Sequence, residues 1–289
     1  MAAESVGLAD PDVKDAFFTL FLTHDPRWKT LQYTLLTEPV RALIGETLIR
    51  EAPRLIHFQG IPPCSSSGTR FCYCPFFRHF ADTLVSLDVT LMRFSSPDSN
   101  HSVTTMSHLR TLKVFSTDAL DQLVAPVLDE LAISCTHHSA ASLPSFIERS
   151  QIFHRLQSLS LLQATTPACV DVIKSLTVLS DLIIEDITVD LPFLRGLSVA
   201  CPKLKTLKIL ESKRRQGPHV HVSKDCLVFL IQFLNDQLEN GTLESVSIQL
   251  GEPLFLETDE ALKGQVEALI AKGVQMTFRG FSVWAEFEW

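Results

Sequence analysis

A short apolar phrase, Leu-x-x-Leu-x-Leu, recurs along most of this chain and constrains its fold more than any other feature. Seven copies, some with Val or Ile in place of Leu, begin at Leu84, Leu109, Leu128, Leu156, Leu179, Leu204 and Leu243. Their spacing runs from 19 residues (Leu109 to Leu128) to 39 residues (Leu204 to Leu243). A recurring phrase of this kind predicts short strands, one from each repeated unit, stacked on a shared core.

Helical sequence fills the intervals between these phrases. A Ser or Thr precedes an apolar helical face at Thr117, Ser142, Thr166, Ser223 and Thr258, and Gly273 follows the last of these segments. Hydroxyl side chains cap the free amides of a first helical turn, and Gly commonly ends a helix. Strand and helix therefore alternate. This pattern predicts an α/β leucine-rich-repeat solenoid, a horseshoe of irregular repeats with a parallel sheet on its concave face and helices on its convex face.

Proline fixes the register of the predicted units. Pro-x-Leu stands just before the strand at Pro53, Pro126 and Pro202, where proline cannot continue a helix. The same register adds a strand at Leu55 and Phe58, and further strands near both ends of the chain. These lie at Trp28, Leu31 and Tyr33, at Val274, Met276 and Phe278, and at Val283 to Trp289. We therefore expect an N-terminal capping helix over residues 1–27, opened by Asp10-Pro11, and a leucine-rich-repeat domain over 28–289 with an aromatic C-terminal cap from about 274.

Composition limits the classes of partner. The net charge of -8, with only 25 Lys and Arg among 289 residues, predicts no broad cationic surface, so we expect neither nucleic acid nor membrane as a partner. Seven cysteines, an odd number, favour reduced thiols in an intracellular compartment, cytoplasmic or nuclear. The first 22 residues lack the pattern of an export signal, and no apolar run is long enough to span a bilayer.

The segment from Ala200 to Ile209, ACPKLKTLKI, resembles the Cys-Pro-x-Leu-x-x-Leu-x-Leu phrase in leucine-rich repeats of F-box proteins. Over residues 28 to 280 the chain is similar to the F-box and leucine-rich-repeat-like proteins of fungi. The resemblance implies repeats that recruit a protein and an F-box that docks on the Skp-type adaptor of a cullin-RING (SCF-type) ubiquitin ligase. Met1 to Pro26 is too short for an F-box and lacks its Leu-Pro-x-Glu phrase, so the ligase role requires an F-box supplied upstream.

Residues between the buried leucines alternate onto the concave face of the predicted horseshoe. The candidates for binding a protein partner there are Asp88, Lys113, Phe115, Glu130, Leu162, Asp181, Ile183, Glu185, Lys208 and Leu210. The apolar members are candidate anchors, and the acidic members are candidate determinants of specificity. The alternative interpretation is that they are ordinary solvated strand positions. The leading functional hypothesis is a non-catalytic protein-interaction module.

Two long loops leave other hypotheses open. Cys64 to Cys74 contains Cys72 and, with His79 nearby, could form a zinc site or serve an enzyme, although Cys-x-Cys lacks the usual two-residue gap. Glu211 to Val222 is also longer than a turn requires, so either loop could carry recognition or be disordered. The chain has no nucleophile elbow, phosphate-binding loop, zinc-protease helix or dinucleotide fingerprint. We therefore expect no enzyme activity, no cofactor and no metal.

Overall fold

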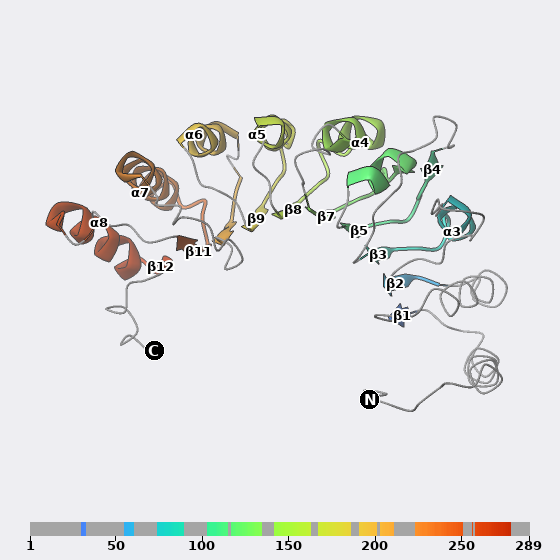
Figure 1. The fold of residues 1–289 in the computed structure, drawn as a ribbon, viewed down its shortest axis with the longest axis horizontal. Coiled ribbons are helices and arrows are strands. Elements are labelled where there is room, and N and C mark those ends of the chain that lie inside the picture. Colours follow the sequence, from blue (N-terminus) through green and yellow to red (C-terminus); the bar gives the residue numbers. More distant parts are fainter. Residues whose placement is uncertain are drawn as a thin grey trace, which may run out of the picture.

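The computed structural model describes residues 30–32, 55–60, 74–89, 103–114, 117–134, 142–162, 167–185, 191–200, 203–210, 223–250, 256 and 258–278. They form a mixed α/β structure with a ten-stranded parallel sheet and a two-stranded one. The large sheet follows the inner side of an arc, and the helices lie along its outer side (Figure 1). The predicted capping helix at 1–27, the strand at 283–289, Phe115, and nearly all of both long loops lie outside the described residues.

The strands of the large sheet occur in the same order in space as in the chain, and every neighbouring pair is parallel. They are β1 (Thr30–Gln32), β2 (His57–Gly60), β3 (Ser86–Val89), β5 (Thr111–Val114), β7 (Glu130–Ser134), β8 (Ser158–Leu162), β9 (Asp181–Glu185), β10 (Thr206–Leu210), β11 (Ser245–Leu250) and β12 (Gln275–Phe278). All seven strands predicted from the apolar phrase are therefore confirmed. The predicted strands at Leu55 to Phe58 and at Val274 to Phe278 are also confirmed, and β1 lies within the segment predicted from Trp28 to Tyr33.

The apolar phrase forms the core because its side chains stack in register from strand to strand. Leu87, Leu112, Leu131, Leu159 and Leu182 are direct neighbours in successive strands. All five are fully buried. Each such leucine contributes about 1.5–3 kcal/mol by leaving water, so the row supplies a large share of the stability of the sheet.

A backbone hydrogen-bond pattern fixes the spacing of the units where the strands begin. The carbonyl of the residue before a strand accepts hydrogen bonds from two consecutive amides of the next unit, as Arg110 does from Asp129 and Glu130. Among the described residues the pattern occurs seven times, from Ile56 to Lys205, with N···O distances of 2.8 to 3.1 Å. Units of unequal length therefore enter the sheet in one register.

The outer layer contains α3 (Cys74–His79), a 3-10 helix η1 (Thr117–Gln122), α4 (Ser142–Ser150), α5 (Pro167–Ser175), α6 (Leu191–Ala200), α7 (Lys224–Glu239) and α8 (Glu260–Ala271), and also the small sheet of β4 (Thr104–Thr105) and β6 (Leu123–Val124). Ser223 caps α7 as predicted, because its Oγ accepts a hydrogen bond from the Cys226 amide at 3.2 Å.

Three local predictions were wrong. The segment after Thr117 forms η1 and β6 rather than an α-helix, because only 19 residues separate Leu109 from Leu128 and a full helix with two connections does not fit. The cap of α8 is Asp259, whose Oδ1 accepts from the Leu262 amide at 3.0 Å, and not Thr258. Cys74, predicted as the end of a loop, is the first residue of α3.

Candidate functional site

The inner face of the large sheet, called here the concave face, carries three rows of side chains that the register places side by side. The first row runs through Ser86, Thr111, Glu130, Ser158, Asp181, Thr206 and Ser245. The middle row runs through Gln59, Asp88, Lys113, Ala132, Ser160, Ile183, Lys208, Ser247 and Gln275. The third row contains Ser134, Leu162, Glu185, Leu210, Gln249 and Thr277.

Nine of the ten predicted binding residues are described, and all nine lie on these rows. Glu130 and Asp181 belong to the first row, and Leu162, Glu185 and Leu210 belong to the third. The middle row holds Asp88, Lys113, Ile183 and Lys208. All nine are partly buried, as side chains that stand on an open sheet face are expected to be. The nine residues therefore share one face of the sheet, and their role in binding stays a prediction.

A hollow of about 210 Å³ lies on this face. Five neighbouring strands, from β3 to β9, supply its lining: Asp88, Lys113, Val114, Ala132, Ile133, Ser134, Ser160, Leu162 and Glu185. Of the predicted residues, the hollow brings together Asp88, Lys113, Leu162 and Glu185. Glu130, Asp181, Ile183, Lys208 and Leu210 do not contribute to its lining.

Small side chains open this hollow. Ala132 and Ser160 are consecutive in the middle row and lie between Lys113 and Ile183, which have longer side chains. Ala132, Ser134 and Ser160 are absent from the predicted set because neither charge nor bulk marks them as contacts. Two small residues at the same repeat position in successive phrases are the sequence signal that could have located the hollow.

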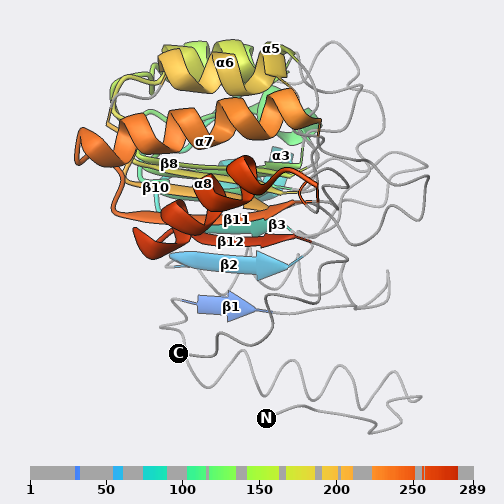
Figure 2. The same cartoon turned by 90° about the vertical axis from the view of Figure 1, so that its left-hand side faces the viewer.

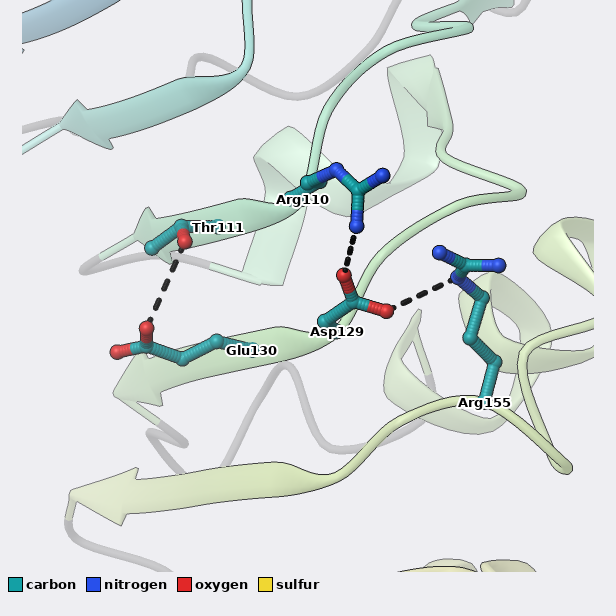
Figure 3. A network of polar contacts seen from close by, with 5 residues as sticks. All are labelled: Arg110, Thr111, Asp129, Glu130 and Arg155. Carbon is teal, nitrogen blue, oxygen red and sulfur yellow. Dashed lines mark hydrogen bonds and ion pairs between the residues drawn. The ribbon is translucent and has the colours of Figure 1, made fainter.

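An ion-pair network lies at the start of strands β5, β7 and β8, and none of its members lines the hollow (Figure 3). Asp129 Oδ2 is 2.9 Å from Arg110 Nη1, and its Oδ1 is 3.0 Å from Arg155 Nε. The Arg155 contact satisfies the distance of an ion pair but not the alignment of a hydrogen bond. Because these side chains are partly exposed, each pair contributes at most about 1 kcal/mol, so the network chiefly orients the strand starts.

Glu130 has two partners of its own within the same region. Thr111 Oγ1 donates a hydrogen bond to Glu130 Oε2 at 3.5 Å (Figure 3). Lys113 Nζ lies 3.6 Å from Glu130 Oε1. The charge of Lys113 is therefore matched by Glu130, a residue outside the lining of the hollow.

Asp88 differs from these acids. Its Oδ1 is buried and accepts no hydrogen bond from the described residues. Burial raises the pKa of the Asp88 carboxyl, and the Lys113 ammonium offsets part of this effect. An ionised carboxylate at this position is therefore poorly solvated within the fold itself.

No protein-family model, curated protein or solved structure matches this chain. The geometry of the concave face is therefore the basis for a functional assignment.

The alternative chemistry predicted from the cysteines rests on residues that lie mostly outside the described part of the chain. Among the described residues, no group of three or more His, Cys, Asp or Glu side chains is arranged to hold a metal ion. Cys64 and Cys72 of the predicted zinc site lie outside those residues. The His79 and Phe80 rings form a T-shaped pair with their centroids 4.7 Å apart. Within the same described part, no helix has the length and apolar character to cross a bilayer.

Proposed function

We propose that this chain is a leucine-rich-repeat solenoid that acts as a non-catalytic protein-interaction module and binds a protein partner on its concave face. The observation that carries the proposal is the inner face of the parallel sheet, which no described helix covers. In the described part of the chain, every helix lies on the outer side (Figures 1 and 2). Parallel sheets are usually covered on both faces, and repeat solenoids, which leave one face open, use it as a binding surface.

The side chains on the open face suit a partner that associates and dissociates. Ser and Thr dominate the first row, and Leu162 and Leu210 of the third row are partly exposed beside the acidic Glu185. Interfaces of this kind combine an apolar centre with polar surroundings, and a few anchors supply most of the binding energy. A permanently covered sheet face would be more uniformly apolar.

The test compares one substitution on each side of the sheet. Ser160→Trp fills the hollow, whereas Glu148→Trp places the same indole on the exposed outer surface of α4. Affinity capture from the native lysate, read by quantitative mass spectrometry, is expected to recover a partner with the wild type and with Glu148→Trp but not with Ser160→Trp. Equal thermal midpoints of the two variants serve as the folding control. A partner retained by Ser160→Trp, or lost from both variants, contradicts the proposal.

A second candidate is the substrate-recognition subunit of a cullin-RING (SCF-type) ubiquitin ligase. Its support is the sequence Cys201-Pro202-Lys203-Leu204, which has the phrase of F-box repeat proteins. In this candidate the same concave face recruits the protein to be ubiquitinated, and an F-box supplied upstream binds the Skp-type adaptor. Co-purification of the adaptor with the full-length gene product is the expected result, and its absence removes this candidate while leaving the interaction module intact.

A further inference from the structure

The shape of the hollow favours an extended segment as its occupant. Its volume of about 210 Å³ is below the roughly 300–1,000 Å³ of sites that enclose drug-sized ligands. Its lining nevertheless crosses five strands, and the four intervals between them span about 19 Å at a strand spacing of about 4.8 Å. A long and shallow hollow accepts one or two side chains of an extended segment better than a compact ligand.

The charges of the lining are unbalanced. Asp88 comes from β3 and Glu185 from β9, the first and last strands that line the hollow. Neither acid forms an ion pair with any described residue, whereas the cation of the lining, Lys113, lies 3.6 Å from Glu130. Asp88 and Glu185 therefore lack an ion-pair partner among the described residues, although the neighbouring Lys113 charge offsets part of the burial effect on Asp88. The middle of the lining, with Ala132 and Leu162, is small or apolar.

Asp88 adds an independent reason for a cationic occupant. Its buried Oδ1 lacks a hydrogen-bond partner among the described residues. A poorly solvated carboxylate gains more from an incoming cation than an exposed one does, because less water is displaced and the local dielectric is lower. The hollow therefore has a position where a positive charge is specifically favoured.

We propose that this hollow is a subsite for a Lys or Arg side chain presented by an extended basic segment of the protein partner. The inference rests on the proposed function. The aliphatic stem of the side chain lies over Ala132 and Leu162, and its charged end pairs with Asp88. Glu185 attracts a second basic residue further along the same segment. The net charge of -8 on the whole chain also attracts a basic partner at long range.

The subsite can be tested without knowing the partner. The probes are four pools of fluorescent random decapeptides with Arg, Lys, norleucine or Glu fixed at one central position, and binding to the full chain is measured by fluorescence anisotropy. The Arg and Lys pools are expected to bind about ten-fold more tightly than the norleucine and Glu pools, the factor that one charge-assisted hydrogen bond supplies.

Matched variants assign the effect to Asp88. Asp88→Asn is expected to weaken binding of the Arg pool about ten-fold. Asp171→Asn makes the same change of charge on the exposed outer surface of α5 and is expected to leave binding of that pool unchanged. Equal binding of the norleucine and Arg pools, or equal losses in the two variants, overturns the inference. If either result appears while Ser160→Trp still abolishes partner capture, the interaction module stands and only the cationic subsite is wrong.

Discussion

Gly196 of α6 faces Val170 of α5 so closely that a Cβ atom on the glycine would lie 2.2 Å from Val170 Cγ1. Valine in a helix has one strongly preferred rotamer, so its methyl groups cannot easily turn away. The contact joins helices of two consecutive units. The spacing of these units on the outer side of the sheet therefore depends on the absence of a side chain at position 196.

Gly196→Ala is expected to destabilise the fold by about 1–3 kcal/mol in urea unfolding, because the added methyl group overpacks this contact. Val170→Ala removes the two methyl groups, so the double variant is expected to lose less stability than the sum of the single variants. Gly264→Ala in α8 is the matched control. A Cβ atom there meets nothing within 4 Å, and the substitution is expected to stabilise the fold by about 0.5–1 kcal/mol. Similar effects of the two Gly→Ala substitutions contradict the close packing.

Gln151 ends α4 in the left-handed conformation, with φ 55°, at the position where Gly241 and Gly273 end α7 and α8. Its amide donates to the Glu148 carbonyl at 3.1 Å, in the hydrogen-bond pattern of a glycine-ended helix. Gln151→Gly is therefore expected to raise the free energy of unfolding by about 0.5–1 kcal/mol, because glycine adopts this conformation without steric cost. Gly241→Ala is the reverse control and is expected to lower it. A destabilising effect of Gln151→Gly means that the glutamine side chain makes a compensating contact.

The sequence predicts the core well because burial in these strands depends on the alternation of apolar residues and on side-chain type. Both can be read from each apolar phrase. Leu109, Leu112 and Val114 specify one strand without knowledge of its neighbours. The cap of α8 is less certain, since Thr258 and Asp259 are both good capping residues and only the backbone decides between them. The hollow is not predictable from single phrases. It requires Ala132 of one unit and Ser160 of the next to lie side by side between longer side chains, which depends on the register between units.

Leu159 and Leu162 lie on opposite sides of β8. Substitutions at these two positions therefore distinguish an effect on the stability of the fold from an effect on binding. Leu159 is fully buried in the core, whereas Leu162 is partly exposed and lines the hollow. Leu159→Ala is expected to cost about 2–5 kcal/mol in urea unfolding, and Leu162→Ala less than about 1 kcal/mol. Leu162→Ala is instead expected to weaken partner capture. Comparable losses of stability in the two variants mean that Leu162 belongs to the core.

Lys224 and Asp259 join the first turns of α7 and α8, with Lys224 Nζ 2.6 Å from Asp259 Oδ2. The hydrogen bond from Lys224, followed by that from the Leu262 amide, lowers the pKa of Asp259 below its ordinary value of 3.8. The stabilising contribution of the carboxylate is therefore present above that value and lost as the pH falls through the folded-state pKa.

Asp259→Asn isolates the charge in this contact, because asparagine also caps helices but cannot form the ion pair. At neutral pH the wild type is expected to have the higher urea midpoint. The difference between the two proteins is expected to shrink as the pH is lowered from about 7 to about 2 and as salt is added. A difference that is independent of both pH and salt assigns the effect to the cap alone.

Asp88 is expected to lower the stability of the free protein. Burial raises the pKa of its carboxyl above 3.8, with partial compensation by Lys113, so the folded state favours the neutral acid. The stability contributed by the neutral form is fully present below the unfolded-state pKa and is lost as the pH rises through the folded-state pKa. Asp88→Asn preserves the shape without the charge.

In urea unfolding, Asp88→Asn is expected to be more stable than the wild type at neutral pH, and the two curves are expected to converge in acid. A less stable Asp88→Asn protein at neutral pH means that a partner within the fold compensates the carboxylate. If Asp88→Asn is the more stable protein, this substitution raises stability and weakens binding at the same time. The reason is that the charge which the free fold tolerates poorly is the one that a basic segment would pair with. The convergence in acid ties the gain in stability to the ionisation of this carboxyl group, since the other carboxyl groups titrate in both proteins.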